Sequence, residues 1–207
     1  MLARVIVVAG PSGSGKSRLC RRLGLPVLNL DDFYKDGDDP TLPRLDLVGG
    51  EPIVDWDDPA SWLADHAVAT IEKLCTDGSA DVPVYDISAS RRTGDRVLDL
   101  GDAGHFVAEG IFAQEIVAAC VARDLLADAV CLDRSALLVF GLRLSRDLRE
   151  HRKPPWVLVR RGLHLMWRQR AVVERARALG CRVVGLQRAA TELSALAAAS
   201  AAGPAGR

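Results

Sequence analysis

A glycine-rich run near the N-terminus matches a phosphate-binding pattern at every fixed position. Residues 10–17 read G-P-S-G-S-G-K-S and fit G-x-x-x-x-G-K-[ST]. Glycines let backbone N–H groups approach phosphate oxygens, Lys16 can bridge the β- and γ-phosphates, and the Ser17 hydroxyl can ligate Mg²⁺. The run therefore predicts a nucleoside triphosphate site formed by Gly10, Pro11, Ser12, Gly13, Ser14, Gly15, Lys16 and Ser17. The alternative is a tight Gly/Ser turn that binds no ligand.

The segments on both sides of this run are those that a phosphate loop needs. Residues 4–9 are largely apolar and β-branched, which favours a buried parallel strand, and residues 16–23 are compatible with a helix. The N-terminal end of such a helix adds positive potential next to the phosphates. Strand, glycine-rich turn and helix are therefore predicted in the required order.

Carboxylates stand at the ends of further predicted strands. Asp31 and Asp32 follow an apolar segment at residues 25–30, and Glu109 ends another at residues 105–109. Charged residues at the carboxyl ends of parallel strands lie where open α/β sheets bind ligands. These acids are therefore candidates for the chemistry around the triphosphate.

The rest of the chain alternates between predicted strands, helices and loops. Residues 35–54 are rich in Asp, Gly and Pro and predict a loop, and residues 60–75 predict a helix with Asp58 as its cap and Pro59 in its first turn. Residues 82–87 and 96–100 predict a hairpin whose tip, 88–95, is basic. Further on, helices are predicted at residues 114–126, 135–148 and from the Pro154-Pro155 pair to about residue 178, and strands at 129–133 and 182–186. This alternation predicts a mainly parallel sheet covered on both faces.

Length and composition favour one domain. A chain of 207 residues that is 49% hydrophobic can bury a full core, and we assign residues 1–196 to a single domain. Residues 197–207 are Ala, Gly, Pro and Arg with a single Ser and no anchoring periodicity, so we expect a disordered tail there. The formal net charge is +0, which gives no overall reason to expect nucleic acid or a membrane as partner. The oligomeric state is left open, a homo-oligomer included.

The cysteines and the N-terminus favour a cytoplasmic protein. Five widely spaced cysteines suggest neither a disulfide framework nor a zinc site, and we expect buried free thiols. The N-terminus leads straight into the first predicted strand without a signal-peptide layout, and no apolar run approaches the roughly 18 residues of a spanning helix.

The remaining residues favour one class of triphosphate chemistry. A GTPase normally carries Asn-Lys-x-Asp, whereas Asn29 is the sole asparagine and is followed by leucine. Small-molecule kinases need a carboxylate at the acceptor hydroxyl, a carboxylate near the metal, and arginines that collect charge on the transferring phosphoryl group. All three kinds of residue are available in this chain.

The order of the motifs resembles the uridine kinase and phosphoribulokinase-like family of P-loop kinases. The matching segments are residues 10–17, Asp31-Asp32-Phe33-Tyr34, Asp55-Trp56-Asp57-Asp58-Pro59, Val82-Pro83-Val84-Tyr85-Asp86 with Arg92, Glu109-Gly110-Ile111 and, more weakly, Arg143-Leu144-Ser145-Arg146-Asp147. The resemblance implies a P-loop NTPase fold of the α/β class: a three-layer α/β/α sandwich with a mainly parallel sheet, a small β-hairpin substrate insertion and a helical lid. It also implies ATP as phosphoryl donor and Mg²⁺ as cofactor.

The same resemblance implies a role for each site residue. Asp31 corresponds to the general base, with Asp32 as a rival, and Asp57, Tyr85, Arg92 and Arg143 correspond to residues that bind the acceptor. Glu109 corresponds to the acid that acts on Mg²⁺ together with Ser17, and Lys16 and Arg146 correspond to residues that contact the ATP phosphates. The residues themselves leave alternatives open: Asp31 or Asp57 as a helix cap, Tyr85 as a packed strand residue, and the two lid arginines as a solvated basic face.

The chain departs from the family pattern at Ser90 and again after Arg149, where residues 151–156 differ from the usual lid and following helix. Pyrimidine kinases usually carry a histidine shortly after the Tyr-Asp pair, and this sequence has Ser90 there. The leading hypothesis is an ATP-dependent kinase of a nucleoside or a related hydroxylated molecule. The alternatives are a kinase for a sugar or a pantothenate-like acceptor and an ATP-binding regulatory protein.

Overall fold

Five parallel strands form the central sheet in the computed structural model, which describes residues 2–11, 13–46, 51–133 and 170–201. The strands run in the order β2-β7-β1-β8-β9. Their bounds are β1 Arg4–Ala9, β2 Val27–Asn29, β7 His105–Glu109, β8 Leu126–Leu132 and β9 Arg182–Val184. Because neighbouring strands are parallel, the carboxyl ends of β1, β2 and β7 lie at the same edge of the sheet.

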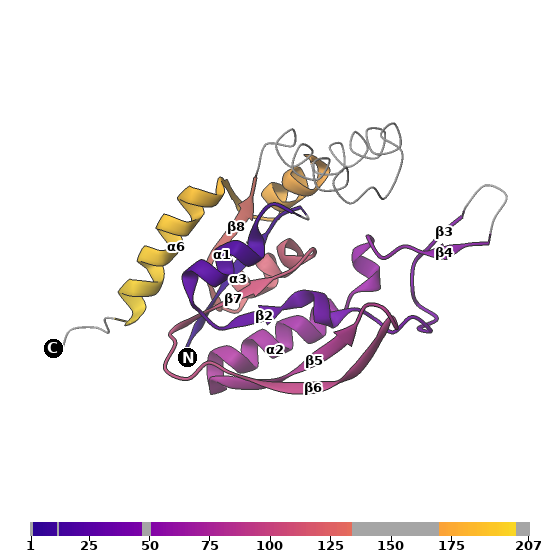
Figure 1. Ribbon diagram of the computed structural model, residues 1–207, viewed down its shortest axis with the longest axis horizontal. Helices are drawn as coiled ribbons and strands as arrows, with labels where there is room; N and C mark the ends of the chain where they lie inside the picture. The colour runs from indigo at the N-terminus through magenta and orange to yellow at the C-terminus, as the bar shows by residue number, and fades with distance from the viewer. Residues whose placement is uncertain (1, 12, 47–50, 134–169, 202–207) are drawn as a thin grey trace, which may run out of the picture.

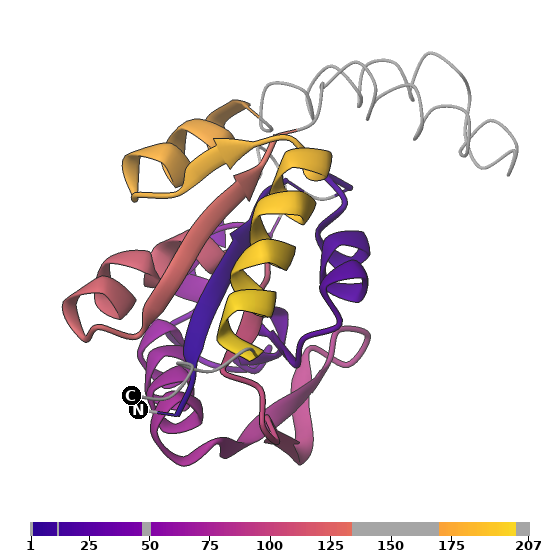
Figure 2. The ribbon, with the colours of Figure 1, turned by 90° about the vertical axis from the view of Figure 1, so that its left-hand side faces the viewer.

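Helices cover both faces of this sheet, because alternate side chains of β1 enter two different cores. Val5 and Val7 pack in a cluster with α2 (Ala64–Asp77) and α3 (Val117–Ala122). Ile6 and Val8 pack in a second cluster with α1 (Lys16–Leu23) and α6 (Leu186–Ala201). Figure 2 shows α6 lying along one face of the sheet. The predicted three-layer α/β/α sandwich is confirmed.

The predicted hairpin is present and longer than expected. It consists of β5 (Ser79–Asp86) and β6 (Arg91–Asp99), which pair antiparallel on the α2 side of the molecule (Figure 1). Arg92 therefore lies within a strand and not in the tip. The second strand was predicted too short because β6 is exposed at every position except Leu98. Its sequence therefore lacks the alternation of apolar and polar residues that marks a half-buried strand.

Helix α2 begins at Ala64, four residues later than predicted. The Asp58 carboxylate accepts a hydrogen bond from the Ala60 N–H at 2.8 Å, and so caps the short 3₁₀ helix η2 (Pro59–Ser61) in place of α2. Trp62 is then extended, and its indole N–H donates to the Leu30 carbonyl at 2.7 Å. This buried tryptophan contact interrupts the helical path that the periodicity indicated.

Two further boundaries differ from the prediction. The 3₁₀ helix η3 (Ala113–Ile116) and α3 end at Ala122, short of the predicted residue 126, because Asp124 adopts a φ of 56° and turns the chain into β8. The predicted loop at residues 35–54 contains a short antiparallel ladder of β3 (Arg44–Leu45) and β4 (Ile53–Val54).

The C-terminal part of the described chain corrects the predicted tail. Residues 170–178 are helical, and α6 continues to Ala201, so residues 197–201 are helical although a disordered tail was predicted from 197. Three α6 residues, Ala189, Ala190 and Leu193, are buried against the sheet. The predicted helix at 135–148 and residues 202–207 lie outside the described residues.

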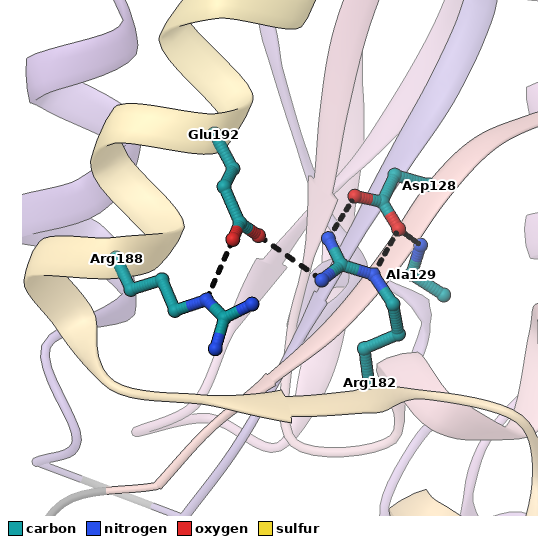
Figure 3. A network of polar contacts seen from close by, with 5 residues as sticks. All are labelled: Asp128, Ala129, Arg182, Arg188 and Glu192. Atoms are coloured by element: carbon teal, nitrogen blue, oxygen red, sulfur yellow. Dashed lines mark hydrogen bonds and ion pairs between the residues drawn. The ribbon is translucent and has the colours of Figure 1, made fainter.

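A network of ion pairs joins β8, β9 and α6 at the edge of the sheet (Figure 3). The Arg182 guanidinium donates to both carboxylate oxygens of Asp128, at 3.2 and 2.6 Å, and to Glu192 at 3.0 Å. Arg188 donates to the other Glu192 oxygen at 2.6 Å, and Asp128 also accepts from the Ala129 N–H. The two carboxylates raise the pKa of Arg182, so it stays charged across the physiological range.

The cysteine prediction is confirmed. All five cysteines are buried and free. Burial raises the pKa of Cys20, Cys120 and Cys181 to about 12, and that of Cys75 and Cys131 to about 11. These thiols are therefore neutral core residues and weak nucleophiles.

Candidate active site

The glycine-rich run forms a tight loop between β1 and α1. Gly10 has a φ of 141°, and a Cβ placed on it would lie 2.9 Å from both the Leu132 carbonyl oxygen and the Ser14 hydroxyl. The packing therefore requires glycine at this position. The Ser14 hydroxyl oxygen is buried and has no hydrogen-bond partner among the described residues, so a ligand oxygen in the loop would satisfy it. Ser12 lies outside the described residues.

Lys16 and Ser17 are the first two residues of α1, directly after the glycine-rich loop. The Lys16 ammonium donates to the Gly10 carbonyl at 2.9 Å, across the loop. The Ser17 hydroxyl donates to the Glu109 carboxylate at 3.1 Å. A hydroxyl and a carboxylate so close together supply the oxygen ligands that Mg²⁺ prefers. The residues present therefore fit a Mg²⁺–triphosphate complex.

Asp31 lies beside the end of β7, in the 3₁₀ helix η1 (Leu30–Phe33) that follows β2. Its carboxylate accepts a hydrogen bond from the Ile111 N–H at 2.8 Å. A Cβ on Gly110 would lie 2.8 Å from the same carboxylate oxygen, so only glycine lets β7 approach this closely. In the sheet register, Asn29 of β2 is level with Glu109 of β7. Asp31 and Glu109 are thus held at one edge of the sheet.

Asp32 points elsewhere, since successive residues of a 3₁₀ helix project in different directions. Burial raises the pKa of Asp32, while hydrogen bonds from the Asn29 side chain and the Tyr85 backbone lower it in part. Its carboxylate therefore faces the hairpin. For an acceptor beside the phosphate loop, this placement favours Asp31 as the base.

Tyr34 lies near two of the acids predicted to surround the acceptor. Its hydroxyl donates to the Trp56 carbonyl at 3.1 Å, and its ring lies 5.7 Å from the Trp56 ring and 5.9 Å from the Tyr85 ring. Burial raises the pKa of Tyr34, and the negative charges of Asp31 and then Asp57 raise it further. Both carboxylates are therefore near this tyrosine.

Tyr85 and Arg92 face each other across the hairpin as cross-strand partners. The Tyr85 hydroxyl donates to the Lys35 carbonyl at 2.9 Å, and Arg92 pairs with Asp95. Next to them is a pocket of about 430 Å³. It is lined by Tyr34, Lys35, Asp36, Asp38, Asp39, Pro40, Leu63 and Arg92.

The structure brings together most of the residues that the sequence singled out. Lys16, Ser17 and Glu109 meet at the phosphate loop, and Asp31, Asp57 and Tyr85 gather around Tyr34. The alternative that Asp57 is a helix cap is wrong, because Asp58 has that place. Arg143 and Arg146 lie outside the described residues.

Sequence reasoning gave no role to three residues that organise the site. Tyr34 was part of a quoted motif, but nothing in its spacing shows that it lies near both Asp31 and Asp57. Asn29, whose side chain accepts from the Asp31 N–H at 3.3 Å, and Asp36 were also missed. A polar residue at the end of a strand is the only signal that could have identified Asn29.

Comparisons with known proteins find distant relatives. No family model matches the chain. The inorganic pyrophosphatase TTM2 of Arabidopsis thaliana is 30% identical over 114 residues, which cover 53% of this chain but only 15% of that protein. A uridine kinase of Streptococcus mutans is 24% identical over 153 residues, covering 70% of this chain and 68% of that protein.

Solved structures share the fold. A candidate fructose transport system kinase from Silicibacter sp. TM1040 superposes with a TM-score of 0.54 at 15% identity, over 88% of this chain and 87% of that one. A candidate uridine kinase from Bacillus stearothermophilus gives a TM-score of 0.46 at 20% identity, over 68% and 76% of the two chains. The superposition on the Silicibacter structure shows that this chain shares its α/β fold, as the sequence predicted.

Over the described ranges, every helix is too short or too polar to cross a bilayer.

Proposed function

We propose that the protein is an ATP-dependent kinase that transfers the γ-phosphoryl group of Mg-ATP to a hydroxyl of a nucleoside or a related small molecule. The observation that carries the proposal is the position of Asp31. Its carboxylate is bonded to the Ile111 N–H at the end of β7, next to the strand end where Glu109 meets Ser17 of the phosphate loop. Asp31, the proposed base, therefore lies at the same edge of the sheet as Ser17 and Glu109, the proposed metal-binding pair.

The phosphate loop holds the donor in this proposal. The backbone of residues 10–17 would bind the triphosphate, and Ser17 and Glu109 would hold Mg²⁺, which would supply positive charge against the triphosphate. The Lys16 ammonium leaves the Gly10 carbonyl and pairs with the phosphates, since a charged acceptor binds it more strongly than a neutral carbonyl. Little covalent chemistry is required of the protein.

Asp31 orients the acceptor hydroxyl and takes its proton as the oxygen attacks the γ-phosphorus in line with the leaving ADP. The hydrogen bond from the Ile111 N–H holds the Asp31 carboxylate in one orientation. The carboxylate is therefore already oriented for the acceptor hydroxyl before the reaction begins. Asp57, Tyr85 and Arg92 bind the remainder of the acceptor. Arg143 and Arg146 are proposed to contact the acceptor and the ATP phosphates.

The test is an ADP-release assay with Mg-ATP across a panel of acceptors. Uridine, cytidine, fructose, other sugars and pantothenate are each added to the same enzyme, and phosphorylated product is identified by mass spectrometry. Acceptor-dependent ADP release with a matching product supports the proposal. Tight ATP binding without any acceptor-dependent turnover would instead indicate the regulatory alternative.

Pyrophosphate and ATP alone belong in the same panel as controls. The chain matches only 15% of the length of the Arabidopsis pyrophosphatase, so that activity does not transfer to it by similarity. Phosphate release from pyrophosphate, with no product on any acceptor, would contradict the kinase assignment.

A further inference from the structure

The loop that follows Asp31 is fastened to the tip of the hairpin by three hydrogen bonds. The Tyr85 hydroxyl donates to the Lys35 carbonyl at 2.9 Å, and the Gly37 N–H donates to the Ser90 carbonyl at 2.7 Å. Between them, the Arg92 N–H donates to the Asp36 carboxylate at 2.7 Å. Of the three acceptors, Asp36 is the one that is a side chain, and it belongs to none of the motifs discussed above.

A bulge in the hairpin accounts for this contact. The register of β5 and β6 shifts between Val84, which pairs with Gly94, and Tyr85, which pairs with Arg92, so Thr93 is the extra residue. The Thr93 hydroxyl donates to the Val84 carbonyl at 3.1 Å, and the Arg92 N–H donates across to the loop. The bulge therefore directs a main-chain donor of the acceptor side toward the segment that carries Asp31.

The hydrogen bond between the Arg92 N–H and Asp36 lies at the surface of the molecule. Asp36 is exposed, and water can replace it at the Arg92 N–H without leaving a buried donor unpaired. Its loss is expected to loosen the hairpin tip while the fold stays intact. Loss of this hydrogen bond is expected to change the distance between Asp31 and the hairpin residues Tyr85 and Arg92.

We infer that Asp36 is a positioning residue for the acceptor: its carboxylate fixes the hairpin residues Tyr85 and Arg92 relative to Asp31. The inference rests on the proposed function, because it assigns a role in acceptor binding. Beyond that function, the inference states that Asp36, a residue outside the phosphate loop, affects the KM of the acceptor. The Asp36 charge also raises the pKa of Tyr85, after burial, which agrees with its closeness to that side chain.

The experiment compares Asp36→Ala with Asp36→Asn in the full chain. Alanine removes the acceptor of the hydrogen bond, whereas asparagine keeps a side-chain oxygen at the same place. With the panel acceptor that gives the highest turnover as the probe, we expect Asp36→Ala to raise the acceptor KM about tenfold, which corresponds to about 1.4 kcal/mol. The KM of ATP should stay within about twofold of wild type, and Asp36→Asn within about threefold for the acceptor.

Asp46→Ala is the matched control, because Asp46 is an exposed aspartate of the same long loop and does not line the pocket. Hydrogen exchange of the peptide containing Arg92 gives a second readout, and it should become faster in Asp36→Ala and remain unchanged in the control. An unchanged acceptor KM in Asp36→Ala, or equal losses for ATP and acceptor, would overturn the inference while leaving the kinase assignment in place. A wild-type protein with no acceptor turnover would refute the proposed function itself, and the inference with it.

Discussion

Asp31 and Asp32 are identical in type and adjacent in sequence, yet their surroundings differ. Asp31 accepts from the Ile111 N–H at the end of β7, and Asp32 interacts with Asn29 and the Tyr85 backbone. We predict that Asp31→Asn abolishes most acceptor turnover because the amide cannot take the proton, while the Kd of Mg-ATP changes little. Steady-state kinetics and ATP titration measure the two effects.

Asp32→Asn serves as the comparison for that experiment, since it makes the same chemical change one residue away. Turnover in Asp32→Asn should remain within about threefold of wild type, because an amide oxygen still accepts the two hydrogen bonds. If Asp32→Asn lost activity and Asp31→Asn kept it, the roles assigned to the two acids would have to be exchanged.

Asp32 also gives a prediction for the pH dependence of stability. Burial raises its pKa in the folded protein, so its stabilising contribution is present below the ordinary aspartate pKa of about 3.9 and is lost as the pH rises through the folded pKa. Asp32→Asn cannot ionise. We therefore expect it to have a higher free energy of unfolding than wild type near neutral pH, with the difference vanishing toward about pH 4.

Urea unfolding over this pH range measures the effect, with far-UV circular dichroism as the signal. A constant difference between Asp32→Asn and wild type at all pH values would show that the carboxyl group is not titrating in the expected direction.

Gly110 offers a test of how closely β7 must approach Asp31. An alanine methyl group would lie 2.8 Å from both the Asp31 carboxylate and the Leu30 Cβ, which is below normal contact distance. We expect Gly110→Ala to reduce kcat and to lower stability by about 1–3 kcal/mol, while ATP binding persists. Gly185→Ala is the control, because a Cβ there meets nothing within 4 Å. Equal kcat values for the two variants would contradict the proposed placement of Asp31.

At the scale of single residues, the sequence identified as candidates those residues that belong to a local pattern. Lys16 and Ser17 belong to a contiguous motif, and Asp31 follows a strand. Tyr34 and Asp36 were missed because their partners, Trp56 and Arg92, are distant in the sequence. A linear pattern carries no information about such contacts.

At the scale of elements, the errors occurred where tertiary contacts override periodicity. The helix α2 starts late because Trp62 is drawn into the core and bonds to Leu30, and β6 was shortened because an exposed strand shows no alternation. The strand β1 was predicted correctly because it is buried on both faces, and a continuous apolar run is the signal for that situation.

The network around Arg182 gives a prediction at this scale. It links β8, β9 and α6, so Arg182→Met should lower the Tm by freeing Asp128 and Glu192 from their shared partner. The side chain of Arg182 is partly exposed, and salt screens exposed ion pairs. The Tm difference from wild type should therefore shrink in about 1 M NaCl, measured by differential scanning calorimetry. A difference that did not depend on salt would indicate a packing role for the arginine stem.

The phosphate loop is attached to a strand that contributes to both hydrophobic clusters of the core. The loop begins where β1 ends, and the two faces of β1 contribute to the two clusters that hold all layers together. The sequence predicted this arrangement well, since predicted strands and helices alternate along the chain. It could not predict the position of α6 on the sheet, because that helix is rich in alanine and carries few large apolar residues.

Because the loop is built into the core, nucleotide binding should stabilise the entire fold. A ligand that binds only the native state at about 100 times its Kd adds about 2.7 kcal/mol, which for a chain of this size raises the Tm by about 5–10 °C. We predict such a shift with Mg-ATP, its absence in Lys16→Ala, and a smaller shift when EDTA removes Mg²⁺ from the Ser17–Glu109 pair. Differential scanning fluorimetry measures all three. An equal shift in wild type and Lys16→Ala would mean that ATP binds outside the phosphate loop, whereas a shift unaffected by EDTA would remove the metal from the binding step.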